Sequence, residues 1–258
     1  MYDTLNSSEI KIAESEITEK EKLSVEDGLN LYKDQKGLDH RLFHAIIRRY
    51  APYIFRKYSI GEKAKLFSNK TTGYFSLYRF YSLFRLITSI KPKIVFEFGS
   101  GASSVFIAEC LELNKKRYGI DGRLYSFEQN EDWYNQFIKL FPKSLMSYTD
   151  LNLRKVKYEY FNNNYRGLYY DYPSYPEKVD LIYVDGPTKT RGNKESDDAI
   201  QVWFCADIVK MKESGTKINF VTTDKRYSNH LFYKEYFHDY KIRFSKYWHT
   251  IIIDQIIR

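Results

Sequence analysis

The chain has 258 residues, of which 43% are hydrophobic, 18% aromatic and 29% charged. This length and composition suit one α/β domain with a buried core and a smaller appendage, and they exclude a largely disordered protein. No apolar run approaches the roughly 20 residues of a membrane helix, and the polar, acidic start lacks the pattern of a signal peptide, so we expect a cytoplasmic protein without a membrane span.

The formal net charge of +8 permits an anionic partner but identifies none, because the basic residues are dispersed along the chain. The two cysteines, Cys110 and Cys205, lie in apolar helix patterns and outside any cluster of Cys or His. We expect them to be small buried side chains, and we expect no structural zinc.

The N-terminal part is predicted to be helical. Residues 1–22 are polar and charge-rich and are predicted to form a mobile tail. Residues 23–73 are predicted to form an N-terminal helical cap, with one helix capped by Ser24, a second over about 39–57, and a loop over 61–73. A third helix is predicted over about 74–89, and Pro92 ends it before the first strand.

From Lys93 onward, predicted strands and helices alternate, which favours a parallel sheet covered by helices on both faces. The predicted strands are Ile94–Phe98, Arg123–Glu128, Lys155–Phe161, Val179–Val184 and Lys217–Thr222, and the predicted helices are Ser103–Lys115, Glu131–Leu140, Asp197–Met211 and Tyr227–Phe237. Two last strands, near Lys241–Ser245 and Thr250–Ile256, are joined by too few residues for a parallel crossover, so they are predicted to form an antiparallel hairpin.

A glycine-rich turn, VFEFGSGASS at 95–104, follows the first strand and opens the next helix. Gly99 and Gly101 permit tight backbone geometry and close approach of a ligand. The N–H groups at the helix start, with Ser103 or Ser104 as cap, favour electron-rich ligand atoms. A turn of this kind also serves as a plain connection between strand and helix, so the motif alone leaves both interpretations open.

Two further acids end strands of the predicted sheet. Glu128 ends the second strand, 31 residues after Glu97, where an acid can accept hydrogen bonds from the ribose hydroxyls of an adenosine. Asp185 ends the fourth strand, in DLIYVDGP at 180–187. Ligands of open α/β sheets bind beyond the carboxyl ends of the strands, so the three acids are predicted to converge on one rim. The same geometry would serve NAD, but Ser104 occupies the third glycine position of the dinucleotide motif and counts against it.

The segments EFGSGASS, YSFEQNEDW and DLIYVDGP resemble the successive signature motifs of class I S-adenosylmethionine (SAM)-dependent methyltransferases. The resemblance is closest to a bacterial group with an EFGSG-type first motif, often associated with glycan or natural-product modification, and it covers about residues 74–258. It implies a Rossmann-like, doubly wound seven-stranded sheet of order 3-2-1-4-5-7-6 whose last strand is antiparallel.

The resemblance also implies a set of cofactor-binding residues: Glu97, Gly99, Ser100, Gly101, Ser103, Ser104, Glu128, Gln129 and Asp185. Within this set, Glu97 and the glycine turn would lie near the methionine moiety, Glu128 on the ribose, and Gln129 beside the adenosine. Asp185 would lie near the sulfonium or the acceptor. Tyr148–Asp150 and Asn162–Asn164 stay open as alternatives for the adenine contacts.

Methyl transfer requires that the acceptor nucleophile is aligned, and a hydroxyl acceptor also benefits from a base or a metal. Asp185 and Asp224 are the candidate catalytic residues, as base or positioning groups. Mg²⁺ held by these two acids stays an alternative, although Lys225 stands where metal-dependent O-methyltransferases often have Asn. The candidate substrate-binding residues, which suit an anionic acceptor, are Lys189, Arg191 and Arg226. The Tyr-rich stretch 162–176 suits sugar stacking or a lid, and a packed surface loop explains it equally well.

The sequence therefore favours O-methylation of a saccharide, a glycan precursor in polysaccharide biosynthesis, or another small molecule. Nucleic-acid methylation is the second hypothesis, but the N/DPPY-type motif of amino-methylating enzymes is absent and DGPT stands in its place. A SAM-binding protein without transfer activity is the third, and an NAD oxidoreductase the fourth. The sequence leaves the oligomeric state open.

Overall fold

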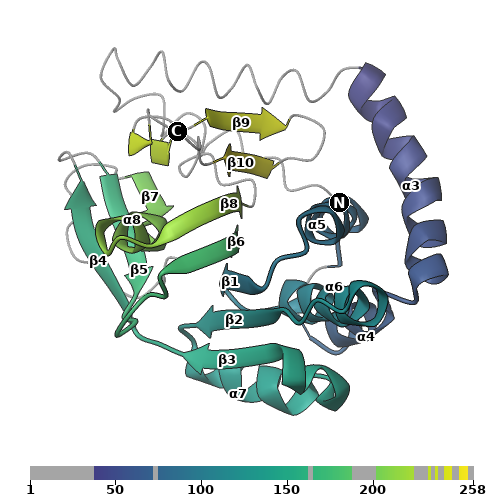
Figure 1. Ribbon diagram of the computed structural model, residues 1–258, viewed down its shortest axis with the longest axis horizontal. Coiled ribbons are helices and arrows are strands. Elements are labelled where there is room, and N and C mark those ends of the chain that lie inside the picture. Colours follow the sequence, from purple (N-terminus) through teal and green to yellow (C-terminus); the bar gives the residue numbers. More distant parts are fainter. Residues whose placement is uncertain are drawn as a thin grey trace.

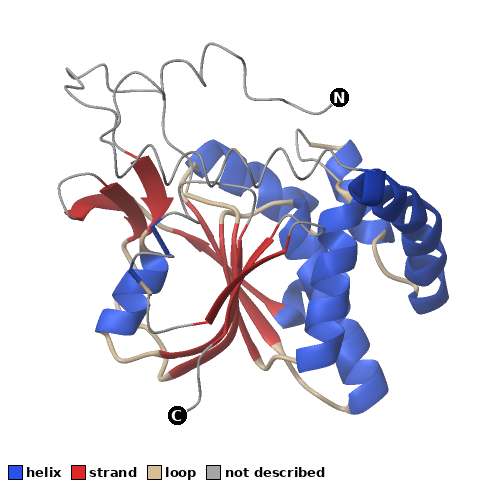
Figure 2. Cartoon of the chain, turned by 90° about the horizontal axis from the view of Figure 1, so that it is seen from above, coloured by secondary structure: helices blue, strands red, loops and turns tan. Residues whose placement is uncertain are grey.

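The computed structural model describes residues 38–71, 75–161, 165–187, 202–223, 232–233, 236–237, 241–245 and 250–254. A central sheet lies between two layers (Figure 1). One layer contains the helices α3 to α7, and the other contains α8 and a second, smaller sheet (Figure 2). The predicted tail and the first predicted helix lie outside the described residues.

The central sheet has seven strands in the order β3-β2-β1-β6-β8-β10-β9. The strands are β1 (Ile94–Phe98), β2 (Arg123–Glu128), β3 (Thr149–Leu153), β6 (Lys178–Val184), β8 (Lys217–Thr223), β9 (Lys241–Ser245) and β10 (Thr250–Asp254). The pairs from β3 to β8 are parallel, whereas β10 is antiparallel to both β8 and β9. Counted within this sheet, the order is 3-2-1-4-5-7-6, and the predicted hairpin of the last two strands is confirmed.

The helices are α3 (Leu38–Tyr58), α4 (Glu62–Asn69), α5 (Leu77–Ile90), α6 (Ala102–Tyr118), α7 (Glu131–Leu140) and α8 (Asp207–Glu213), with a 3₁₀ turn η1 (Lys143–Tyr148). The smaller sheet has the order β4-β5-β7, from β4 (Val156–Phe161), β5 (Tyr165–Tyr170) and β7 (Val202–Cys205). In the described residues, no helix is long and apolar enough to cross a membrane.

Alternation along β1 divides the core between the two faces of the sheet. Val95 belongs to the cluster on the side of α3 to α7, where Phe80 of α5 stacks on Phe106 of α6 with ring centroids 4.7 Å apart. Phe98 faces the other side, where it stacks on Tyr170 of the smaller sheet at 5.9 Å. Since side chains alternate along a strand, Glu97 points to the same side as Val95, toward the helices.

Three predictions for the smaller sheet and its neighbours were wrong. The third strand of the central sheet is β3, with the sequence TDLNL, and not Lys155–Phe161, which forms β4. β3 is an edge strand and is mostly half-buried, so it does not need an apolar sequence. Part of the Tyr-rich stretch is β5, and the predicted helix Asp197–Met211 contains β7 before α8 begins. The sequence of β7, VWFC, is rich in aromatic and β-branched residues, which favour a strand over a helix.

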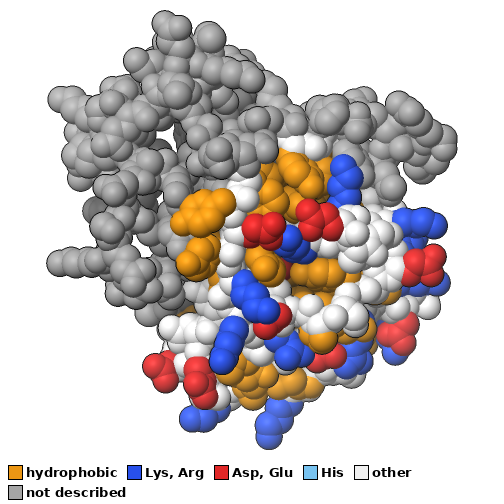
Figure 3. All heavy atoms as spheres, turned by 90° about the vertical axis from the view of Figure 1, so that its left-hand side faces the viewer, with side chains coloured by type: hydrophobic (Ala, Val, Ile, Leu, Met, Phe, Trp, Pro, Cys, Tyr) orange, Lys and Arg blue, Asp and Glu red, His pale blue; other side chains and the backbone are white. Residues whose placement is uncertain are grey.

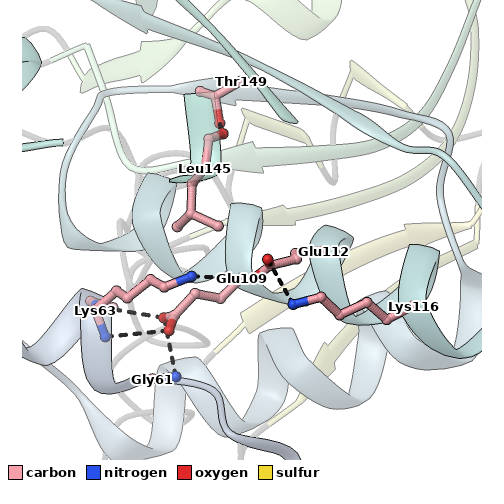
Figure 4. Close-up of polar contacts among 8 residues, drawn as sticks. Gly61, Lys63, Glu109, Glu112, Lys116, Leu145 and Thr149 are labelled. Atoms are coloured by element: carbon pink, nitrogen blue, oxygen red, sulfur yellow. Dashed lines mark hydrogen bonds and ion pairs between the residues drawn. The ribbon is translucent and has the colours of Figure 1, made fainter. Parts of the chain in front are cut away.

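The predicted loop 61–73 was also wrong, because it contains α4. Gly61 precedes this helix with a φ of 83°, in the left-handed region that favours glycine, and offers no side-chain cap. The cap comes from Glu109 of α6, whose carboxylate accepts hydrogen bonds from the N–H groups of Gly61 (3.1 Å), Lys63 (3.3 Å) and Ala64 (3.3 Å) (Figure 4). A residue distant in the sequence therefore satisfies the free amides of the helix start, and no local pattern signals it.

We expect Glu109→Ala to lower the free energy of unfolding by about 2–3 kcal/mol, because three amides lose their acceptor in a site where Glu109 is only 3% exposed. Burial raises the pKa of Glu109 to about 7, against the opposing effect of the three amides and Lys63, so urea denaturation should be measured at pH 8, where the carboxylate dominates. Glu112→Ala on the same helix is the matched control. Glu112 pairs with Lys63 and Lys116 at the surface, and its loss should cost about 0–1 kcal/mol. Equal losses for both variants would contradict the capping role.

Candidate functional site

The carboxyl ends of β2, β1 and β6 lie side by side at one edge of the central sheet. Phe98, the last residue of β1, pairs with Phe127 of β2 and with Val184 of β6. The next residues along these strands are Gly99, Glu128 and Asp185. The register therefore brings the glycine turn and two of the predicted acids to the same level of the sheet.

The glycine turn is fixed from both neighbouring strands. Gly99 donates its N–H to the carbonyl of Phe127 (3.0 Å), and Asp185 donates its N–H to the carbonyl of Phe98 (2.8 Å). Gly99 has a φ of 99°, and a Cβ added there would lie 2.6 Å from the backbone nitrogen of Gly186. Both the backbone conformation and this close approach therefore require glycine at position 99.

Gly101 differs from Gly99 because a Cβ added there would meet no atom of the residues that the structure describes within 4 Å. It is the N-cap residue of α6, and its N–H donates to the side-chain oxygen of Ser104 (2.9 Å). Ser103 and Ser104 are both buried. The turn therefore leaves open space beside the first amides of a 17-residue helix, where electron-rich ligand atoms are favoured.

Glu97 is fully buried beneath this turn. Its Oε2 accepts a hydrogen bond from the hydroxyl of Ser126 (2.7 Å), and Ser126 in turn contacts the hydroxyl of Ser104 (3.3 Å). Burial raises the pKa of Glu97 to about 8, the nearby serine hydroxyls hold it down, and the charge of Asp185 raises it further. Among the described residues, its Oε1 has no hydrogen-bond partner. A donor from a ligand, direct or through a water molecule, would satisfy this oxygen.

Glu128 is 8% exposed and lies between the glycine turn and the start of α7. Its Oε1 accepts from the backbone N–H groups of Gln129 (2.8 Å) and Asn130 (2.9 Å), and its Oε2 accepts from the hydroxyl of Ser100 (2.9 Å). Trp133 of α7 also donates its indole N–H to the carbonyl of Ser100 (3.1 Å). A carboxylate accepts about four hydrogen bonds, so a ribose hydroxyl could take the remaining position or displace Ser100.

Asp185 has a partner that the sequence did not suggest. Nη1 of Arg79, on α5, lies 3.2 Å from Oδ1 and 3.3 Å from Oδ2 of Asp185. The two side chains are 32% and 31% exposed, respectively. In the sequence, Arg79 is one basic residue in a helix with an apolar stripe, and only the tertiary structure brings it to the rim.

Some predicted residues do not belong to this rim or lie outside the described residues. Tyr148–Asp150 lies toward the other end of the sheet, because Asp150 pairs with Tyr125 near the start of β2. Leu153 and Arg154 are instead next to Glu128, since Leu153 pairs with it and Arg154 donates its N–H to the Glu128 carbonyl (2.8 Å). The residues outside the described part are Asn162–Asn164, Lys189, Arg191, Asp224, Lys225 and Arg226.

A metal site is not visible in the part of the chain that the structure describes. No group of three or more His, Cys, Asp and Glu side chains is placed there to hold a metal ion. Cys110 and Cys205 are both buried, as expected for small core residues. Cys205 lies in β7 and not in a helix as predicted, and its thiol donates to Oδ2 of Asp207 (3.3 Å).

The chain was compared with known proteins and structures. It matches no protein-family model and no curated protein sequence. Among solved structures it is similar to the SAH-bound methyltransferase PaMTH1 of Podospora anserina, with 13% identity and a TM-score of 0.48, over 74% of this chain and 85% of that one. It is also similar to the SAM-bound O-methyltransferase TomG of Streptomyces achromogenes, involved in tomaymycin synthesis, with 14% identity and a TM-score of 0.33, over 69% of this chain and 64% of that one. Both TM-scores lie below 0.5.

We expect the free energy of unfolding to fall as the pH rises from about 5 to about 8.5. The pKa of Glu97 is about 8 in the folded chain and about 4.5 ordinarily, so the folded chain keeps a proton that the unfolded chain has lost. The stabilisation is complete below about pH 4.5 and is lost as the pH passes through 8. Urea denaturation across this range should show a shallower fall for Glu97→Gln, which stays neutral, with a difference on the order of a few kcal/mol.

The free energy of unfolding should still fall with rising pH in Glu97→Gln, because burial also raises the pKa of Asp207 to about 8 and that of Glu109 to about 7. Glu131→Gln, at an exposed position of α7, is the control and should follow the wild type. Parallel curves for the wild type and Glu97→Gln would contradict the assignment.

Proposed function

We propose that this chain is a SAM-dependent methyltransferase of the EFGSG type, whose cofactor lies along the rim from β2 across β1 to β6. The observation that carries the proposal is the register that aligns Gly99, Glu128 and Asp185 at the ends of three adjacent parallel strands. The strand order and the antiparallel β10 support it, because the same order is implied by the motif resemblance.

The residues at the rim fit the chemical groups of SAM. Glu128 offers a carboxylate to the ribose hydroxyls, at the start of a helix that holds it in place. The open space beside Gly101 would take the methionine moiety. Its ammonium group would supply the positive charge and the donor that Glu97 Oε1 lacks among the described residues. Ser103 and Ser104 would support the turn from inside the helix.

When bound, SAM supplies an electrophilic methyl group on a sulfonium. The protein's part is to align the acceptor hydroxyl with that group and to take up its proton. In this proposal Asp185 orients the hydroxyl or accepts its proton at a carboxylate oxygen. Asp224 is the second acid, because it follows β8, whose last residue Thr223 pairs with Val184. The pairing of Asp185 with Arg79 already supplies a cation at this carboxylate, which disfavours Mg²⁺ there.

The proposed acceptor is a saccharide, a glycan precursor or another small molecule, methylated on oxygen in the cytoplasm. The sequence assigns Lys189, Arg191 and Arg226 to its binding, which suits an anionic acceptor. On the described part of the face that carries β4, the charged side chains support a small molecule over nucleic acid as the acceptor. Basic and acidic side chains alternate on it (Figure 3), and Lys157 pairs with Asp171 and Lys210 with Glu159. Such paired charges do not make a basic surface for phosphates.

The experiment that tests this function is calorimetry with SAM and S-adenosylhomocysteine (SAH). We expect both to bind the wild type and Glu128→Gln to weaken both by about 10-fold to 100-fold, because a charged hydrogen-bond acceptor for the ribose is lost. Glu131→Gln makes the same charge change at an exposed position of α7 and should bind as the wild type does.

Gly101→Val tests the same site by filling it. The added Cβ would meet no atom of the described residues within 4 Å, so the variant should unfold at nearly the wild-type temperature and yet lose SAM binding. Failure of the wild type to bind either compound would contradict the function, and preferential binding of NAD would favour an oxidoreductase. Binding without turnover on any acceptor pool would favour a protein that has lost transfer activity.

We also expect SAM to displace a proton on binding at pH 7. The free protein keeps Glu97 largely protonated, because its pKa is about 8, and a cationic ligand beside it favours the carboxylate. Calorimetry in buffers with different ionisation enthalpies should therefore report the release of somewhat less than about one proton. Glu97→Gln should bind without proton release. A binding enthalpy that does not depend on the buffer would show that the ligand does not approach Glu97.

A further inference from the structure

Arg79 and Asp185 are held in place by separate parts of the fold. Arg79 lies in the first turn of α5, where its N–H donates to the side chain of the N-cap residue Ser76 (3.4 Å). The next residue, Phe80, is 1% exposed and stacks on Phe106 of α6. On the other side, Asp185 is fixed by its N–H bond to Phe98 and by the contact between Gly186 and Gly99. The ion pair therefore joins two anchored backbones.

The pair also balances the charge of one end of the site. Asp185 and Glu97 are close enough for the charge of one to oppose ionisation of the other. Without a cation, this end of the rim would carry two carboxylates when a ligand ionises Glu97. Nη1 of Arg79, within 3.3 Å of both oxygens of Asp185, offsets one of these charges.

We infer that Arg79 is a positioning residue that fixes Asp185 and sets the charge at the methyl-transfer end of the site, and thereby sets the preference for the cationic cofactor over its neutral product. This inference rests on the proposed function. SAM and SAH differ by one methyl group and one positive charge, so the local charge separates them while the adenosine and amino-acid contacts are shared.

Such a balance has a physical reason. Methyl transfer disperses the positive charge of the sulfonium, so an interaction that is stronger in the ground state than in the transition state slows the reaction. A site with Asp185 unpaired would bind the sulfonium more tightly and gain little in the transition state. Arg79 reduces this attraction while it keeps the carboxylate oriented toward the acceptor.

The test is the ratio of SAM affinity to SAH affinity, measured by calorimetry. We expect Arg79→Gln to raise the ratio by about 3-fold to 10-fold, as one unit of charge near a partly exposed site would, and high salt should reduce the gain. Asp185→Asn should lower the ratio, and the double variant should return it toward the wild-type value. Arg79→Lys keeps the charge and should stay close to the wild type.

Arg85→Gln is the matched control, because it removes a cation from an exposed position of the same helix and should leave the ratio unchanged. The inference would be overturned if the Arg79→Gln variant kept the wild-type ratio of SAM affinity to SAH affinity, including the case in which both affinities fall equally. Arg79 would then have only a structural role. Failure of the proposed function gives a different result, since the wild type would then bind neither SAM nor SAH.

Discussion

The backbone contact between Gly99 and Gly186 is the constraint on which the site depends. A Cβ added to Gly99 would lie 2.6 Å from the nitrogen of Gly186, and a Cβ added to Gly186 would lie 2.7 Å from the Cα of Gly99. No other residue permits this approach, and it locks the turn after β1 against the turn after β6. The start of α6 and the backbone of Asp185 take their positions from these two turns, so the backbone sets the geometry of the rim, and Arg79 contacts the carboxylate of Asp185 from α5.

Most of the central sheet could be predicted because its strands carry their own signal. The buried positions of β1, β2 and β6 are mainly apolar, and a glycine or an acid marks the end of each strand. The limits of β1 and β2 were therefore predicted correctly, and β6 begins one residue earlier than predicted, at Lys178. β3 carried no such signal, since an edge strand needs no apolar sequence. The short β7 and the helix α4 were missed for another reason, because each is stabilised by a distant partner: β5 for the strand and Glu109 for the helix.

The site shows the same division between local and tertiary information. The places of Glu97, Glu128 and Asp185 could be predicted because each lies at or near the carboxyl end of a buried strand, at the edge of the sheet where ligands bind. Arg79 could not, because its role depends on how α5 packs on α6, and the sequence of α5 indicates only an amphipathic helix. The hydrogen bonds that Glu128 accepts from the start of α7 could not be predicted either, because the sequence does not show which groups donate to an acid at the end of a strand.

Burial raises the pKa of Glu97, Glu109 and Asp207, and the three acids differ in the hydrogen-bond donors that surround them. Asp207 and Glu109 are buried with all the donors they need, from Tyr170 and Cys205 in one case and from the start of α4 in the other, and they hold elements together. Glu97 is buried with one oxygen that has no partner among the described residues. An unsatisfied buried carboxyl oxygen costs free energy, and the proposed cofactor would satisfy this one. Under the proposed function, a site built in this way would favour a cationic ligand over a neutral one, and Arg79 would limit that preference.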